Sequence, residues 1–273
     1  AAFMLNEEAD KLISLKSDIN ALFNSPVLGY NSKDDIVYQF WANRDSHEVY
    51  YFDPKTDYAP TTAISSISWD DPNFPNIEGF GVWAAKCNFT MGPDGKMYSR
   101  MLGGNLVRID VENARGENLT NGDLVGTKDG SAYGLVFDPQ DENVFYFSNN
   151  DKHCIYKYDL RTKECACWAG QEGKSGYLDG PIGQAMFNKP GQMCVDSEGN
   201  IILTDTENHC IRKITMSTGY VSTLAGKPQN SGYVNGSAED AQFKKPLGIC
   251  IDNDDVMYIG DSENRAIRRL AVE

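Results

Sequence analysis

Short apolar runs alternate with polar turn residues along most of the chain. Between residues 187 and 226 the apolar runs fall at 192–195, 201–203, 210–214 and 220–224, with Asp, Gly, Asn, Ser or Thr clustered between them. Apolar runs this short, bounded by residues that favour turns, are typical of β-strands. The pattern therefore predicts a meander of four short antiparallel strands.

The same unit is written a second time, 56 residues later in the chain. Phe187 and Asp205 recur as Phe243 and Asp261, and a similar glycine-rich spacer precedes both copies. Self-similarity at a fixed period indicates a repeat architecture. A four-stranded meander cannot bury both of its faces alone, so copies must stack, and radial stacking of such sheets is a β-propeller. The predicted fold class is all-β, a β-propeller of four-stranded antiparallel blades.

The repeated motif resembles a known family. It reads Ala-Gly, Gly-Tyr-x-(Asp/Asn)-Gly, Ala-x-Phe-x-x-Pro, Val-Asp-x-x-Gly-Asn and Asp-x-x-Asn-x-x-Ile-Arg-Lys-Ile, which is similar to the NHL repeat. The match is strong from Phe187 to Leu270, recognisable from Ala132 and faint upstream. The resemblance implies a single propeller domain over residues 1–273, usually of six blades. Five units are visible, at about residues 23–66, 83–125, 131–170, 187–226 and 243–273. A total of six blades would place one upstream of Ala1.

The segments outside these units carry their own predictions. Residues 1–6 are apolar and fall in the repeat phase of a fourth strand, so they are expected to complete the last blade and close the ring. Residues 7–22 place apolar side chains at nearly helical spacing, which predicts a short helix. Residues 66–81 form the longest irregular spacer, and spacers of this length are usually functional or mobile.

Charge and composition exclude several classes of partner. The formal net charge is −14 and the pI is about 4.6, which argues against nucleic acid and anionic lipid because phosphates require a basic face. The sequence has no apolar run of 18 residues, so no membrane span is expected. The seven cysteines are read as small apolar core residues. The alternative for two of them is a disulfide between Cys154 and Cys167 across a hairpin.

Histidines, arginines and aromatic residues are the candidates for ligand binding. Three histidines begin the third strand of their units, and equivalent side chains on different blades lie too far apart to share a metal ion. They either hold turns or form, with nearby arginines, a ring suited to an anionic ligand such as a carboxylate sugar. Aromatic residues near the spacers either pack between blades or form a platform for sugar rings. The candidate ligand-binding residues are Trp41, Arg44, Trp69, Trp83, Arg100, Tyr133, His153, His209 and Arg265.

Asp205 and Asn208 recur as Asp261 and Asn264, and they could be read as calcium ligands. Repetition in successive units favours a structural role, in which these side chains satisfy the backbone groups of turns. No metal or other cofactor is expected.

The sequence favours binding over catalysis. It lacks a Gly-x-Ser-x-Gly elbow, and the predicted inner strands begin with few charged groups. The family resemblance implies a non-enzymatic propeller that captures a glycan or nutrient at a bacterial cell surface, outside the cytoplasm, in proteins that often carry an IPT/TIG module before it. The alternatives are a protein-interaction scaffold and a hydrolase or lyase of the gluconolactonase type. The expected partner is a small molecule, a glycan or another protein, and the chain is expected to be a monomer.

Overall fold

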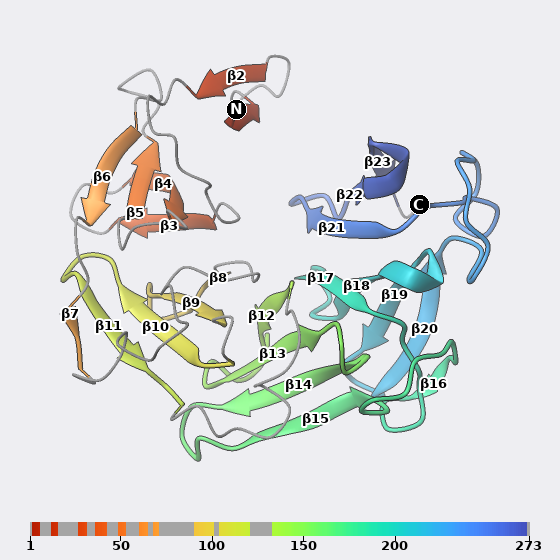
Figure 1. Cartoon of the computed structure of the whole chain (residues 1–273), viewed down its shortest axis with the longest axis horizontal. Coiled ribbons are helices and arrows are strands. Elements are labelled where there is room, and N and C mark those ends of the chain that lie inside the picture. The colour runs from red at the N-terminus through yellow and green to blue at the C-terminus, as the bar shows by residue number, and fades with distance from the viewer. Residues whose placement is uncertain are drawn as a thin grey trace. The chain divides into compact units, whose positions relative to one another are not determined.

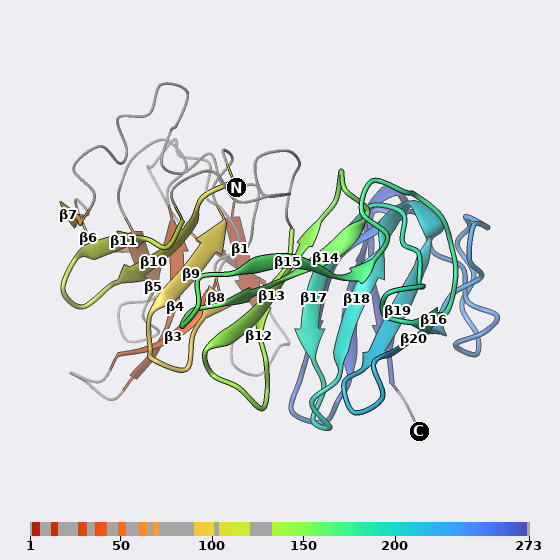
Figure 2. The same ribbon diagram turned by 90° about the horizontal axis from the view of Figure 1, so that it is seen from below.

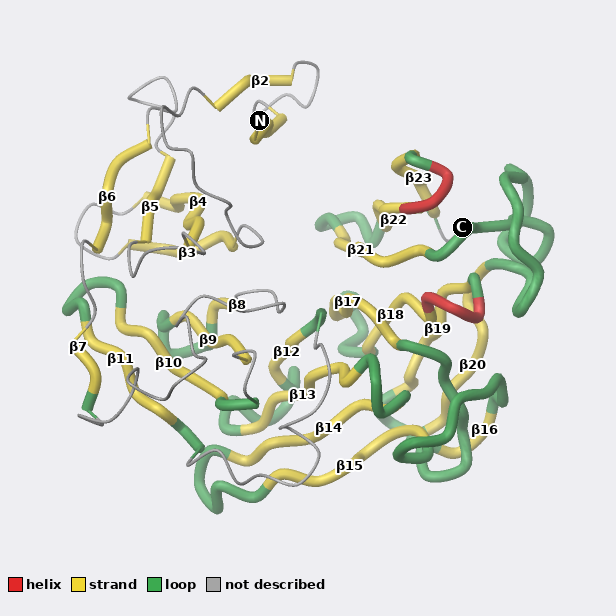
Figure 3. Tube along the Cα trace, in the orientation of Figure 1, coloured by secondary structure: helices red, strands yellow, loops and turns green. Residues whose placement is uncertain are grey.

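The computed structural model describes residues 2–5, 12–15, 27–31, 36–42, 49–52, 60–64, 68–70, 90–100, 104–120 and 133–271. In this part of the chain the fold is all-β, and its sheets are the antiparallel meanders of a β-propeller. Helix is limited there to two short 3₁₀ turns, Thr206–Asn208 and Ser262–Asn264, drawn red in Figure 3. The chain divides into two compact units.

The first unit holds three sheets. A hairpin pairs β1 (Ala2–Leu5) with β2 (Leu12–Leu15). A four-stranded sheet runs in the order β3 (Val27–Asn31), β4 (Ile36–Ala42), β5 (Val49–Phe52) and β6 (Pro60–Ile64). The third sheet has five strands, in the order β7 (Ser68–Trp69), β11 (Arg115–Asn118), β10 (Leu106–Asp110), β9 (Met97–Arg100) and β8 (Thr90–Met91).

The structure bears on two predictions about the N-terminal region. The helix predicted over residues 7–22 is wrong, because Leu12–Leu15 is a strand that pairs residue by residue with Ala2–Leu5. Backbone pairing with a nearby apolar run outweighs a weak local preference for helix. The partner of β1 in the structure is β2, and its part in completing the last blade stays a prediction.

The long spacer between the first two predicted blades also contains a strand. Within it, β7 runs parallel to β11, with Trp69 opposite Gly116. The spacer therefore adds an outer strand to the sheet that follows it, instead of forming only irregular structure.

The second unit holds three further sheets, which lie side by side in Figure 1, coloured from green to blue. The first comprises β12 (Leu135–Phe137), β13 (Val144–Asn149), β14 (Cys154–Asp159) and β15 (Cys165–Gly170). The second comprises β16 (Gly180–Pro181), β20 (Tyr220–Ala225), β19 (Cys210–Thr215), β18 (Ile201–Asp205) and β17 (Pro190–Val195), and β17 to β20 are seen side by side in Figure 2. The third comprises β21 (Pro246–Ile251), β22 (Met257–Asp261) and β23 (Ala266–Leu270).

The strands of the second sheet carry apolar side chains on both faces, and these side chains pack against the two neighbouring sheets. Ile201 and Leu203 pack with Val144, Ile155 and Phe187 in one core cluster between the first and second sheets. The intervening residues of the second sheet point the other way, where Ile202 and Ile211 join Phe243, Ile249 and Ile259 in another cluster. A strand with apolar residues on both faces is what a sheet stacked between two neighbours requires.

The cysteines in this part of the chain are free, including Cys154 and Cys167. Cys154 is fully buried at the start of β14, and Cys167 lies on the adjacent strand β15. The bridge considered from the sequence is therefore not formed, and Cys154 fills the core as a small apolar side chain.

Candidate functional site

The charges that recur with the repeat are buried within the sheets. Arg212 on β19 and Asp205 on β18 are both fully buried, and the guanidinium donates to the carboxylate at 2.7 Å. The backbone N–H of Asn188 and the side chain of Asn208 also donate to Asp205, at 2.7 and 2.9 Å. Burial raises the pKa of Asp205 to about 6, so the carboxyl is still ionised at neutral pH.

Arg212 also ties the glycine-rich spacer to the sheet. It donates to the carbonyls of Leu178 and Met186 and to the carboxylate of Asp179. The last sheet repeats the arrangement, because Arg268 donates to Asp261 at 2.9 Å and to Asn235 at 2.7 Å. The recurring Asp, Asn and Arg side chains are thus occupied by one another and by backbone groups, which is an architectural role.

The recurring histidines link neighbouring sheets. His153 and His209 adopt the left-handed conformation, with φ of 56° and 58°. The Nδ1 atom of His153 accepts the backbone N–H of Lys189 at 3.1 Å, and that of His209 accepts the N–H of Lys245 at 3.2 Å. Each histidine therefore holds the start of the next repeat, and the ligand-binding role predicted for both stays a prediction.

The other residues predicted to bind ligand are dispersed. Arg265 occupies the histidine position of the last sheet with φ of 54° and is exposed. Arg100 is 1% exposed at the end of β9. Tyr133 is half-buried, and its N–H donates to Ser148 Oγ. Trp41 lies in β4 and Trp69 in β7, while Arg44 and Trp83 lie outside the described residues.

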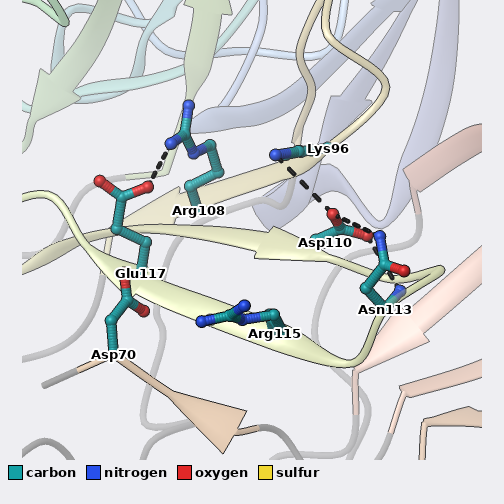
Figure 4. Close-up of a pocket in the computed structure, with 8 residues that line it drawn as sticks. Asp70, Lys96, Arg108, Asp110, Asn113, Arg115 and Glu117 are labelled. Atoms are coloured by element: carbon teal, nitrogen blue, oxygen red, sulfur yellow. Dashed lines mark hydrogen bonds and ion pairs between the residues drawn. The ribbon is translucent and has the colours of Figure 1, made fainter.

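A charged pocket of about 580 Å³ lies along the outer strands of the β7–β11 sheet. Its lining comes from β7's end, the start of β9 and the β10–β11 hairpin: Asp70, Lys96, Arg108, Asp110, Asn113, Arg115, Gly116 and Glu117. Figure 4 shows these side chains gathered along the hairpin. Three are acidic and three basic, so the lining is balanced in charge although the chain is strongly acidic.

Strand pairing brings this lining to one face of the sheet. Arg108 lies opposite Tyr98 on one side and Glu117 on the other, and Asp110 lies opposite Arg115. Residues directly opposite one another in adjacent strands point to the same face. The intervening residues Met97, Val107 and Ile109 are fully buried on the other face. One face of this sheet is therefore core and the other is charged.

Ion pairs and hydrogen bonds fix most of the lining. Arg108 donates to Glu117 and lies 3.7 Å from Asp94, which also accepts the hydroxyl of Tyr98 at 2.9 Å. Lys96 lies 3.7 Å from Asp110. These pairs are drawn as dashed lines in Figure 4 where both partners line the pocket. Side chains held in this way are ordered before a ligand arrives, which lowers the entropy cost of binding.

The carboxylate of Asp110 is a strong acceptor. Partial burial acts to raise its pKa, but hydrogen bonds from the side chain and backbone of Asn113 and the charge of Lys96 outweigh it, so the net pKa is lowered. Asp110 therefore stays ionised over the working pH range. The pocket offers fixed carboxylate acceptors beside guanidinium and ammonium donors, an arrangement that can hydrogen-bond the hydroxyls of a small polar molecule.

The sequence reasoning placed one candidate beside this pocket and missed the rest. Trp69 lies opposite Gly116 and directly before Asp70, both of which line the pocket. The missed residues carry a signal in the alternation Arg108, Asp110 and Arg115, Glu117, on either side of a tight turn. Charges two residues apart on paired strands share a face.

Comparison with known proteins supports the repeat assignment. Residues 187–214 match the NHL repeat. The chain is 25% identical over 271 residues to protein SUPPRESSOR OF QUENCHING 1 of Arabidopsis thaliana, covering 92% of this chain and 25% of that protein. It is 30% identical over 152 residues to NHL repeat-containing protein 2 of Gallus gallus, covering 55% of this chain and 19% of that protein. The chain thus spans a quarter or less of the length of these relatives.

A solved structure shares the fold over nearly the whole chain. It is the crystal structure of an auxiliary nutrient binding protein from Bacteroides ovatus, with a TM-score of 0.74 and 21% sequence identity. The likeness covers 99% of this chain and 64% of that one. Within the described residues, no helix has the length and hydropathy that crossing a bilayer requires.

Proposed function

We propose that this NHL-repeat β-propeller is a binding protein that takes up a small sugar or a similar hydroxyl-rich nutrient in the charged pocket of the β7–β11 sheet. The observation that carries the proposal is the pocket itself, a space of about 580 Å³ with a balanced and largely pre-paired set of charged side chains. That volume falls in the range of small-molecule sites.

The chemistry of the lining favours a hydroxyl-rich ligand. Carboxylates such as Asp110 and Glu117 accept hydrogen bonds from hydroxyls, and Arg108 and Lys96 donate to them. The similar structure from Bacteroides ovatus is that of an auxiliary nutrient binding protein.

The proposal assigns no chemical step to the chain. The buried ionisable groups with the most developed hydrogen bonding, Asp205 and Arg212, are paired with each other inside the sheet. We further propose that the chain captures its ligand outside the cytoplasm of a bacterial cell, as the family resemblance implies. Fractionation of the source cells with an antibody to the chain would test this location.

Isothermal titration calorimetry against a panel of monosaccharides and disaccharides tests the binding. We expect saturable binding of at least one sugar, weakened about tenfold or more in the double variant Arg108→Gln/Glu117→Gln. Arg161→Gln is the matched control, because Arg161 is paired with Asp141 and Asp159 on another sheet and does not line the pocket. Failure of every sugar to bind the wild-type chain would overturn the proposal.

A further inference from the structure

We propose that the sugar carries a carboxylate, and that Arg115 is the residue that binds it. The inference rests on the proposed function, and it narrows the ligand from hydroxyl-rich molecules in general to monoanionic sugars such as hexuronates.

Among the residues that the structure describes, Arg115 differs from the other cations of the pocket in having no ion-pair partner. Arg108 is paired with Glu117 and Asp94, and Lys96 is paired with Asp110. Arg115 forms no ion pair with any residue in the described ranges, and its side chain is exposed. The pairing of its neighbours leaves Arg115 as the cation whose charge is available to a ligand.

The backbone of Arg115 is held on both sides. The residue begins β11, where it lies opposite Asp110 of β10 and beside Ser68 of the parallel strand β7. The N–H of Ser68 donates to the carbonyl of Ala114 at 2.9 Å, and the N–H of Asp70 donates to the carbonyl of Gly116 at 3.1 Å. These bonds bracket Arg115, so its side chain projects from a fixed strand and not from a loose loop.

The position of the guanidinium suits a carboxylate. Figure 4 shows the Arg115 side chain lying along β11, between the Arg108–Glu117 pair on one side and the Lys96–Asp110 pair on the other. A guanidinium presents parallel N–H donors that match the two oxygens of a carboxylate. The paired carboxylates on both sides of it are then placed to accept hydroxyls from the remainder of the same sugar.

The same acidic neighbours limit the charge of the ligand. Asp70, Asp110 and Glu117 line the pocket around Arg115. Each of them would repel a phosphate or a polysulfated chain more strongly than a single carboxylate, because like charges in a partly enclosed site destabilise one another. The lining therefore favours one negative charge on an otherwise hydroxyl-rich molecule.

An exposed arginine elsewhere on the chain gives the matched comparison. Arg161 is also exposed and also lies by the turn between the last two strands of a blade, but Asp141 and Asp159 hold it at 2.6 and 2.7 Å. Arg115 is not paired with any described residue and lies in a pocket.

Calorimetry with paired sugars tests the inference on the full chain. The probes are glucuronate against glucose and galacturonate against galactose, measured at low salt and again near physiological salt. We expect the wild type to bind at least one uronate about tenfold more tightly than its neutral counterpart. Arg115→Gln should abolish that preference, and Arg115→Lys should retain part of it. Arg161→Gln should leave both affinities unchanged.

The outcomes separate this inference from the proposed function. Equal affinity for the uronate and the neutral sugar in the wild type, or an undiminished preference in Arg115→Gln, would overturn the role of Arg115 while leaving sugar binding intact. Absence of binding to every sugar would overturn the proposed function as well. Thermal unfolding of Arg115→Gln serves as the folding control, and we expect it to match the wild type because the side chain is exposed.

Discussion

Two sheets of this chain use charge in opposite ways. The β16–β20 sheet places Asp205 and Arg212 at its centre, both with fully buried side chains. The β7–β11 sheet keeps its interior face apolar and places Arg108, Asp110 and Glu117 on the other face, around a pocket. The first set of charges orders the sheet and its spacer, and the second is the set that we propose contacts a ligand.

The repeat tells the two sets apart. The buried pair of the β16–β20 sheet recurs in the last sheet as Asp261 and Arg268, with the same bond to a spacer residue. In the β7–β11 sheet the strand pairing places Val107, a fully buried apolar residue, where Arg212 stands. On the pocket face, a cation at the position of Arg108 recurs in the other sheets as Lys157, Lys213 and Arg269. Arg115 and Glu117 of β11 do not recur in the β16–β20 sheet, where Tyr220 and Ser222 hold their positions. The charges of β11 are therefore the better candidates for function.

The largest expected effect is the loss of a buried cation. Arg212→Met should destabilise the chain by about 3–5 kcal/mol, because it leaves the Asp205 carboxylate buried without its counter-charge. Urea denaturation followed by circular dichroism measures the change. Arg108→Met is the counterpart on the pocket face, and it should cost less than about 1 kcal/mol because that pair is partly exposed. Equal losses in the two variants would break the comparison.

A smaller loss is expected at a recurring glycine. Gly226 has φ of +98°, and an added Cβ would lie 3.0 Å from the carbonyl oxygen of His209 and 3.0 Å from the ring of Phe243. Gly226→Ala should therefore cost about 1–3 kcal/mol in the same denaturation experiment. Gly183→Ala is the control, because nothing lies within 4 Å of its added Cβ. If Gly226→Ala were as stable as the wild type, the close approach of His209 and Phe243 would not constrain this position.

The histidine link predicts a dependence on pH. Burial, with a contribution from the charge of Lys189, lowers the pKa of His153 below its usual value near 6.5. The unfolded chain therefore binds the proton more readily, so stability is fully present above pH 6.5 and declines as the pH falls below it. His153→Asn can keep both the left-handed backbone and an acceptor, and it should flatten the decline of the melting temperature between pH 7 and 5. An unchanged slope would show that other groups cause the decline.

The smallest expected change in stability lies in the pocket. Glu117→Gln should alter the free energy of unfolding by less than about 1 kcal/mol, since its pair with Arg108 is partly exposed. It should nevertheless weaken sugar binding about three- to tenfold, because Arg108 loses the partner that orients it. Glu198→Gln, whose pair with Lys213 lies on the β16–β20 sheet, should change neither quantity. A large stability loss in Glu117→Gln would assign the pocket to architecture.

The sequence was sufficient for the fold because the repeat encodes it twice. Alternating runs, turn residues and the 56-residue shift from Phe187 to Phe243 together predict stacked meanders, and these sheets are present. The structural reading of Asp205 and Asn208 also agrees with their hydrogen bonds. Local pattern was insufficient for residues 12–15, where pairing with an upstream segment determines the backbone.

The pocket could not be predicted from the sequence, for a different reason. Its residues lie in a blade that matches the repeat only faintly, so no motif marks them. Their proximity depends on the register that sets Arg108 opposite Glu117 and Asp110 opposite Arg115, and on the parallel strand β7 that brings Asp70 alongside. A turn predicted over residues 110–115 would give the register of β10 with β11. The position of β7 depends on tertiary pairing and cannot be predicted from a local pattern.

The short strand β16 limits how a strand from another molecule can pair with the edge of this sheet. It covers β20 with two residues, Gly180 and Pro181, and the second of them has no N–H to offer. An outermost strand so brief, and lacking a donor at that point, is a poor template for a strand from another molecule. The spacer that joins two blades thus also disfavours edge-to-edge association of this sheet with another molecule.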